Sequence, residues 1–223
     1  MNGASAFSRA ARERTAPRWD AVLGHPFLLG LADGSLPEEA FRRYMVQDYL
    51  FLVEYARVMA LAAAKARDLD SMGRLAELLH ATLNQEMQLH RDFCSRVGIG
   101  LAELEQSPML PGCHAYTSHL LAVAWGESAA VLAASLLPCQ LGYAEIAAHL
   151  ARRGRSPVPA YQEWVDAYAS DDYVRLALWL GQHADALFVS AGSAERRHME
   201  EVYLESLRLE HGFWDMAWGE SHG

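Results

Sequence analysis

Polar and apolar side chains follow one another along this chain with the spacing of helices. In the long run from Glu39 to Ala66, apolar residues recur every three or four positions, which predicts an amphipathic helix. No run alternates polar and apolar residues with the period of two that marks a half-buried strand. The pattern therefore predicts an all-helical protein.

Residues that start and stop helices flank these periodic runs. Ser35-Leu36-Pro37-Glu38 has the spacing of a capping box, with proline in the first turn, so we expect a helix to start there. A second run, from about Asp70 to Val97, ends at Gly98, which suits the left-handed position after a helix. The remaining predicted helices are 116–125, 128–153, 159–168, 171–189 and 193–218.

The organisation of the chain predicts a single domain. Connections between the helices are short, and no internal repeat or low-complexity linker divides the sequence. Isoleucine occurs at only two positions and threonine at three, whereas alanine and leucine dominate, so strand-favouring residues are scarce. We expect residues 1–223 to form one helical bundle, with 218–223 as a frayed tail.

Charge and cysteine content argue against several classes of protein. The chain is 52% hydrophobic and has a formal net charge of −9, which speaks against a disordered chain and against nucleic-acid binding. No apolar run approaches the roughly 20 residues of a membrane span, and no apolar signal core is present. Three cysteines without zinc-ligand spacing indicate reduced thiols. We therefore expect a cytoplasmic protein that binds neither membranes nor nucleic acids.

Asp48 is a carboxylate on an apolar helix face. Burying a charge is costly unless the charge is paired or serves a function, so a carboxylate at this position requires a partner or a role. The carboxylate could accept hydrogen bonds from an amino-heterocycle held between aromatic rings, or it could be satisfied by a Tyr or Arg of another helix. Its neighbours at helical spacing are Phe41, Tyr44, Met45, Phe51, Leu52 and Tyr55.

Cys139 follows a proline inside a predicted helix. Pro138 removes one backbone hydrogen bond and is expected to bend the helix, and Tyr143 lies one turn further on the same face. A thiol with an ordinary pKa of about 8.5 needs help from the fold to act as a nucleophile. The alternative is that Cys139 is a small buried hydrophobe. Cys94 and Cys113 lack a comparable setting.

The last predicted helix contains acidic residues on different faces. Glu210 shares its face with Tyr203, Leu207, Phe213 and Trp214, which predicts that it points inward. A buried Glu has a raised pKa, as a general acid or base near neutrality requires, although a structural role in pairing or capping is an alternative. Glu205 shares its side with Glu201 and Arg208, which predicts a solvated position.

A metal site is a competing interpretation. Glu86 and His90 lie one turn apart, with His80 on the same helix, and His183 and Asp185 occur on another. A carboxylate-bridged di-iron site needs further ligands, usually repeated Glu-x-x-His pairs on facing helices, and these are missing from the sequence. We therefore expect no metal and no other cofactor. An iron-dependent oxidase remains the alternative.

Short motifs spread over positions 25 to 218 resemble the TenA (thiaminase II) family, and they occur in the family's order. They are His25-Pro26-Phe27, Asp33-Gly34, Gln47-Asp48, Glu86-Met87 with His90, Tyr116-Thr117-Ser118-His119, Leu136-Leu137-Pro138-Cys139, Tyr161-Gln162 with Trp164, and Phe213-Trp214. The resemblance implies a haem-oxygenase-like helical fold without haem, usually a homotetramer. It also implies salvage of the thiamin pyrimidine through hydrolysis of 4-amino-5-aminomethyl-2-methylpyrimidine, and cleavage of thiamin.

The same resemblance implies a role for seven residues. Cys139 would be the nucleophile that adds to the pyrimidine ring, and Glu210 the acid and base that protonates the departing amine and activates water. Asp48 would bind the ring nitrogen and amino group. The remaining four would position substrate and nucleophile or line the pocket: Phe51, Tyr116, Tyr143 and Tyr168.

This chain departs from the family pattern at a few positions. Many members have Tyr where Phe51 stands, bulky aromatics where Gln140, Leu141 and Gly142 follow the cysteine, and an aromatic where Leu209 precedes the glutamate.

The leading hypothesis is a cofactor-free hydrolase of an aminopyrimidine C–N bond. The alternatives are the iron-dependent oxidase and a binding or regulatory protein, although the net charge of −9 speaks against direct DNA contact.

Overall fold

A computed structural model describes residues 6–219, and within that range every regular element is helical. The order is α1 (Phe7–Arg14), α2 (Ala16–Leu23), α3 (Pro26–Asp33), α4 (Glu38–Lys65), α5 (Leu69–Ala81), the π-helical turn η1 (Thr82–Glu86), α6 (Met87–Arg96), α7 (Leu101–Gln106), α8 (Pro111–Gly126), α9 (Ala129–Ala151), α10 (Pro159–Tyr168), α11 (Asp171–Ser190) and α12 (Ser193–Trp218). The expected all-helical bundle is confirmed for these residues.

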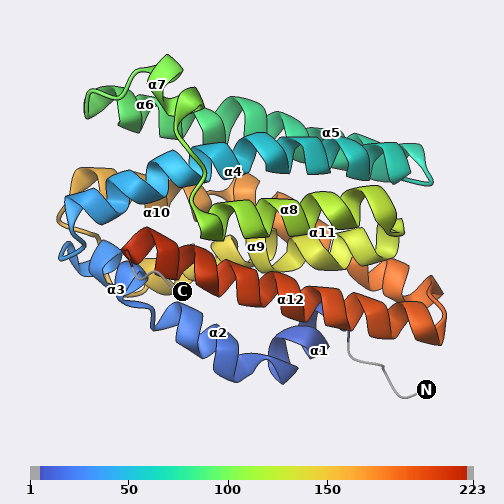
Figure 1. The fold of residues 1–223 in the computed structure, drawn as a ribbon. Coiled ribbons are helices and arrows are strands. Elements are labelled where there is room, and N and C mark those ends of the chain that lie inside the picture. The colour runs from blue at the N-terminus through green and yellow to red at the C-terminus, as the bar shows by residue number, and fades with distance from the viewer. Residues whose placement is uncertain (1–5, 220–223) are drawn as a thin grey trace.

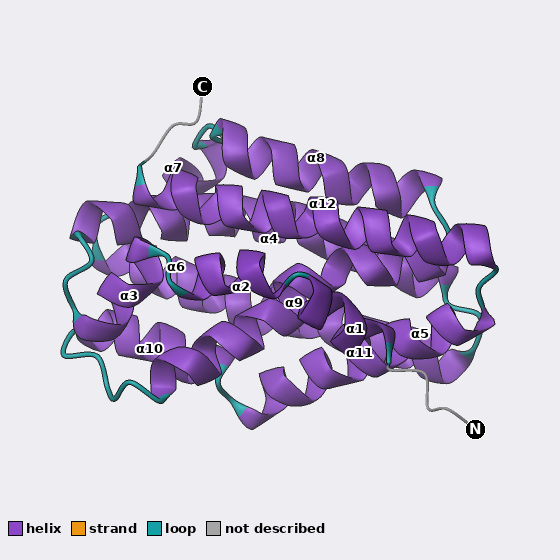
Figure 2. Cartoon of the chain, turned by 90° about the horizontal axis from the view of Figure 1, so that it is seen from below, coloured by secondary structure: helices purple, strands orange, loops and turns teal. Residues whose placement is uncertain are grey.

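The long helices lie side by side around α9 (Figures 1 and 2). Helix α9 packs against α11 and α12, while α4 packs against α5, α8 and α12. Helices α1 and α2 lie along the outer side of this bundle, and α10 closes one end between α9 and α3. The faces that α4, α8, α9, α10 and α12 turn inward therefore meet in one core.

Helix α9 is the most enclosed of the long helices. By length and composition it could cross a membrane, but 83% of its most apolar 18-residue stretch is buried in the bundle. The expectation that no apolar segment reaches this length is corrected, because the small residues of α9 let a long apolar helix lie inside a helical core. Gly142 shows the fit: a Cβ there would lie 2.4 Å from a ring carbon of Trp19.

Several helix boundaries differ from those that the sequence predicts. The Ser35 capping box is wrong, because Pro37 is the N-cap and Ser35 instead donates its backbone N–H to Asp33 Oδ1 at 2.9 Å. Gly34 lies within that turn and has φ 85°. Helices α1, α2, α3 and α7 were not predicted, and α8 starts at Pro111 rather than Tyr116.

The predicted helix from Asp70 to Val97 is interrupted. The wider turn η1 separates α5 from α6, and Gly98 adopts the expected left-handed conformation, with φ 81°. At the other end of the chain, α12 runs to Trp218 and Gly219 has φ 106°. Residues 220–223 of the expected frayed tail lie outside the described residues.

Candidate active site

The seven predicted site residues converge in the core from five helices. Asp48 and Phe51 come from α4, Tyr116 from α8, Cys139 and Tyr143 from α9, Tyr168 from α10 and Glu210 from α12. All seven are buried, with exposed fractions between 1% and 7%. The inward positions predicted for Asp48 and Glu210 from helical periodicity are therefore confirmed.

Asp48 lies at one end of this cluster. Tyr44 donates its hydroxyl proton to Asp48 Oδ2 at 2.9 Å, and Trp164 donates its indole N–H to the Tyr44 hydroxyl at 3.0 Å. The hydroxyl of Tyr143 lies 3.5 Å from that of Tyr44. Because Tyr44 accepts from Trp164, its own proton is directed to Asp48.

His90, on α6, holds the same carboxylate oxygen. Its Nε2 lies 2.7 Å from Asp48 Oδ2, and its Nδ1 lies 2.7 Å from the backbone oxygen of Glu86. Burial lowers the pKa of His90, but the hydrogen bond to Asp48 and the charge of Asp48 outweigh it, so the pKa is raised. A carbonyl and a carboxylate both accept hydrogen bonds, so these two contacts favour the doubly protonated imidazolium form of His90. Both described bonds to Asp48 end on Oδ2, which leaves Oδ1 for a ligand.

Cys139 faces acidic groups rather than a positive field. Burial raises the pKa of its thiol well above the ordinary value, and the charges of Glu210, Asp48 and Glu86 raise it further, while the nearby Tyr55 hydroxyl lowers it. Tyr55 donates its hydroxyl proton to Gln140 Oε1 at 3.0 Å. The resting group is therefore the thiol, and it needs a proton acceptor to react.

Glu210 is enclosed next to Tyr116 and Trp214. Burial and then the charge of Asp48 raise its pKa to about 8, against smaller lowering effects of Tyr116 and Trp214. Among the described residues, Glu210 Oε1, Tyr116 Oη and Trp214 Nε1 are buried without a hydrogen-bond partner. Buried polar atoms with unused capacity are uncommon and are typical of functional sites. Glu205 is partly exposed, as its predicted solvated position requires, and bonds Arg208 at 2.6 Å.

Aromatic rings surround these polar groups. Phe51 packs against Tyr116, with ring centroids 5.1 Å apart, and Tyr143 packs edge-on against Tyr168 at 4.9 Å. The departures after Cys139 have structural reasons, because Gln140 accepts from Tyr55 and Gly142 makes room for Trp19. An aromatic-walled group of acids is suited to binding a flat, nitrogen-rich heterocycle.

Sequence reasoning did not identify several residues that complete the cluster. Tyr44 and Tyr55 were visible only as aromatic neighbours of Asp48 on its helix, and His90 was considered only as a candidate metal ligand. Trp164, on α10, is buried, and Tyr173, on α11, packs on Tyr168. These positions depend on packing between helices, which no local pattern shows.

The residues of the iron hypothesis are not brought together. Both ring nitrogens of His90 are engaged, Nδ1 by the Glu86 carbonyl and Nε2 by Asp48. His80 bonds Asn84, His183 stacks on Trp179, and Asp185 accepts from Ser8. Among the described residues, no three of these candidate ligands bring their donor atoms together.

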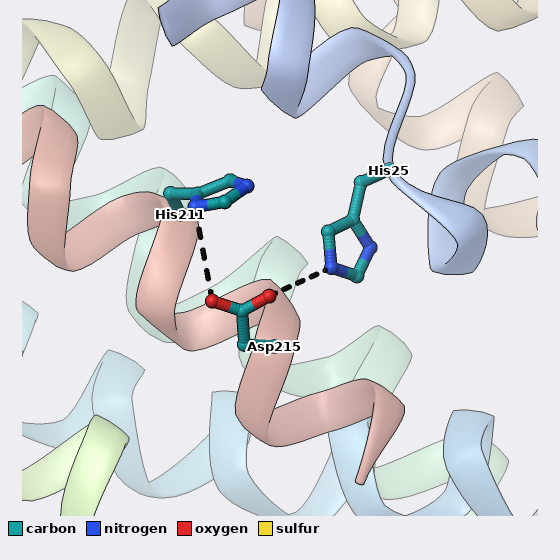
Figure 3. Close-up of side chains that lie close together, drawn as sticks. All are labelled: His25, His211 and Asp215. Atoms are coloured by element: carbon teal, nitrogen blue, oxygen red, sulfur yellow. Dashed lines mark hydrogen bonds and ion pairs between the residues drawn. The ribbon is translucent and has the colours of Figure 1, made fainter. Parts of the chain in front are cut away.

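One other group of potential ligands was found among the described residues. His25, His211 and Asp215 bring their donor atoms within 4.8 Å of one another (Figure 3). His25 Nδ1 accepts the backbone N–H of Phe27 at 3.1 Å, so Nε2 carries the ring proton and faces Asp215 Oδ1 at 3.2 Å. A protonated Nε2 cannot ligate a metal. The group instead ties the start of α3 to the end of α12.

Comparisons with known proteins identify the class. The model of the TENA/THI-4/PQQC family matches residues 12–220. An aminopyrimidine aminohydrolase from Halalkalibacterium halodurans is 43% identical over 215 residues, which cover 96% of each chain. A solved structure described as a TenA family transcription regulator, from Silicibacter, has a TM-score of 0.89 at 30% identity and covers 96% of both chains.

The fold extends to more distant proteins. A domain of unknown function with a haem-oxygenase-like fold, from Shewanella denitrificans, has a TM-score of 0.74 at 17% identity and covers 95% of this chain and 92% of that one. The protein therefore has the haem-oxygenase-like helical fold that the family resemblance implies. It belongs to the TENA/THI-4/PQQC family.

Proposed function

We propose that this protein is an aminopyrimidine aminohydrolase of the thiaminase II type, acting in salvage of the thiamin pyrimidine. Its substrate would be 4-amino-5-aminomethyl-2-methylpyrimidine, with thiamin as a second substrate. The observation that carries the proposal is the meeting of a thiol, an acid of raised pKa and a restrained carboxylate inside aromatic walls, namely Cys139, Glu210 and Asp48. The aminohydrolase relative, 43% identical over nearly the whole chain, supports it.

Asp48 recognises the pyrimidine in this proposal. Its Oδ2 is held by Tyr44 and His90, so Oδ1 is oriented before a ligand arrives. A carboxylate oxygen can accept from the amino group and from a protonated ring nitrogen, which distinguishes an aminopyrimidine from other flat rings. Phe51, Tyr116, Tyr143 and Tyr168 would position and stack the ring.

Cys139 provides the covalent step. Its sulfur bonds the ring carbon beside the substituted methylene, the electron pair of that ring bond moves to the ring nitrogen, and the ring nitrogen takes the thiol proton. The C–N bond then breaks, and the nitrogen leaves with both electrons of that bond. Breaking the reaction into addition and elimination lowers each barrier.

Glu210 exchanges protons in the second half of the reaction. Because its pKa is raised to about 8, it holds a proton at neutral pH and gives it to the departing ammonia. The resulting carboxylate takes a proton from water as the water oxygen bonds the methylene, and sulfur then leaves the ring with its proton restored. The balance is an aminomethyl cation plus water giving the hydroxymethyl pyrimidine and ammonium.

The remaining expectations are part of this proposal. The chain would act as one helical domain over 1–223, as a homotetramer in the cytoplasm and without cofactor, nucleic acid or membrane. A tetramer is supported by exposed apolar side chains such as Trp125 and Val189, which are 72% and 74% exposed in the isolated chain. Light scattering that gives a monomer mass at micromolar concentrations would refute the tetramer.

The proposed activity is tested with purified protein. Incubation with 4-amino-5-aminomethyl-2-methylpyrimidine is expected to release ammonium and the hydroxymethyl pyrimidine in equal amounts, and a chelator is expected to leave the rate unchanged. Loss of turnover after chelation with recovery on adding iron would favour the oxidase instead. Absence of product from both pyrimidine substrates would contradict the proposal and favour a binding or regulatory protein.

A further inference from the structure

A surface cleft lies beside the buried cluster, between the π-helical turn and the junction of α10 with α11. It contains about 550 Å³ of empty space, part of it open to solvent. Its lining is Gln85, Glu86, Leu89, Ala167, Tyr168, Ser170 and Tyr173. None of the roles proposed above uses Glu86 or Tyr173.

Two tyrosines connect this cleft to the proposed active site. Tyr168 packs on Tyr143 from one side and on Tyr173 from the other, with centroids 5.0 Å apart in the second pair. Tyr168 therefore lies between Tyr173 of the cleft and Tyr143 of the proposed active site.

Glu86 presents the carboxyl group of the cleft. It ends the π-helical turn η1, and Thr82 donates its hydroxyl proton to Glu86 Oε1 at 3.1 Å. Burial and the nearby charge of Asp48 raise the pKa of Glu86 to about 7. Wide turns of this kind inside α-helices occur often at functional sites. His90, one helical turn after Glu86, bonds Asp48.

The lining has the chemistry of a cation site. It combines one carboxyl group with two phenol rings and has no basic side chain. A carboxylate and aromatic faces together stabilise a positive charge. Both proposed substrates have a positive nitrogen on the methylene of the pyrimidine: an ammonium, since alkyl amines have pKa values near 10, or the fixed charge of a thiazolium.

We propose that Glu86, with Tyr168 and Tyr173, binds the cationic leaving group of the substrate, while Asp48 binds the pyrimidine. This inference rests on the proposed function and specifies where the departing half of the substrate lies. The cleft is wide enough for a ring as well as for ammonia, so it accounts for both substrates. It also gives the product amine a direct path to solvent.

The test separates charge recognition from pyrimidine recognition. Binding is measured by calorimetry in a Cys139→Ser background, which prevents consumption of the ligand. Thiamin is the charged probe, and 4-amino-5-hydroxymethyl-2-methylpyrimidine is the neutral one. Glu86→Gln keeps the oxygen that accepts from Thr82 but removes the charge, Glu86→Asp keeps the charge, and Glu201→Gln alters an exposed acid of α12 as a control.

Glu86→Gln is expected to weaken thiamin binding by about tenfold or more, the range of a charge-assisted hydrogen bond, and to leave the neutral pyrimidine unaffected. Glu86→Asp should retain most of the affinity for thiamin, and Glu201→Gln all of it. Equal weakening of both probes would overturn the inference and give Glu86 a structural role. No change for thiamin would also overturn it. If neither probe binds the Cys139→Ser parent, the proposed function itself fails.

Discussion

His90 Nε2 lies 2.7 Å from Asp48 Oδ2, and both side chains are buried. With Nδ1 bonded to the Glu86 carbonyl, this pair forms a buried ion pair whose carboxylate cannot rotate freely. The pair therefore orients Asp48 Oδ1 and lowers the ordering cost of binding a pyrimidine.

The charge state of His90 is directly measurable. In protein labelled with ¹⁵N-histidine, we expect His90 to keep its second ring proton to a higher pH than an ordinary histidine does, because its pKa is raised. His119 serves as the internal control, because burial lowers its pKa. Loss of this proton from His90 at or below the pH at which His119 loses its own would contradict the ion pair.

Asp48→Asn should affect binding more than folding. The amide keeps the shape of the side chain but replaces a charged acceptor, which is worth about 1.5–3 kcal/mol, so we expect pyrimidine affinity to fall by about 10–100-fold. Calorimetric titration with the hydroxymethyl pyrimidine checks the affinity, and a thermal melt checks the fold. Unchanged affinity would make Asp48 structural.

Glu210 and Glu205 offer a matched comparison within one helix. Glu210 has a pKa raised to about 8, whereas its bond with Arg208 lowers the pKa of Glu205. An acid must be protonated to act, so parent activity should decline as pH rises through about 8. Glu210→Gln should lose that limb and about 10²–10⁴-fold in turnover, while Glu205→Gln should match the parent. Equal mild effects would place the acid elsewhere.

Stability of the ligand-free protein should fall as pH rises. Folding raises the pKa of Glu86 to about 7 and of Glu210 to about 8 from 4.5, so the folded state binds more protons across that window. Their contribution is full below 4.5 and is lost as pH rises through the folded values. The raised pKa of His90 acts in the same direction. We expect the Tm to drop by several degrees, at about 2–4 °C per kcal/mol, and Glu210→Gln to flatten the slope.

The sequence predicts much of the fold because the spacing of apolar residues in a long amphipathic helix indicates which face is buried. Helices α4, α9, α10, α11 and α12 match their predicted ranges within about two residues, the usual uncertainty of helix ends. The short helices α1–α3 and α7 have too few turns for a clear period. The sequence does not indicate the turn η1, because no residue type distinguishes a π-helical turn from the α-helix around it.

The candidate site is predictable only in part, for a similar reason. Periodicity places Asp48 and Glu210 inward because each lies among apolar neighbours on its own helix. The pairing of His90 with Asp48 joins α6 to α4, and the cleft at Glu86 joins η1 to α11. Such contacts depend on how helices pack, which spacing within one helix cannot show.

The most direct test of the proposed mechanism compares the three cysteines. Cys139, Cys94 and Cys113 are all buried, but only Cys139 faces Glu210, Asp48 and Glu86 together. We expect Cys139→Ala to be folded and to release no ammonium from 4-amino-5-aminomethyl-2-methylpyrimidine, whereas Cys94→Ala and Cys113→Ala retain turnover. Substantial ammonium release by folded Cys139→Ala would contradict the assignment of Cys139 as the nucleophile.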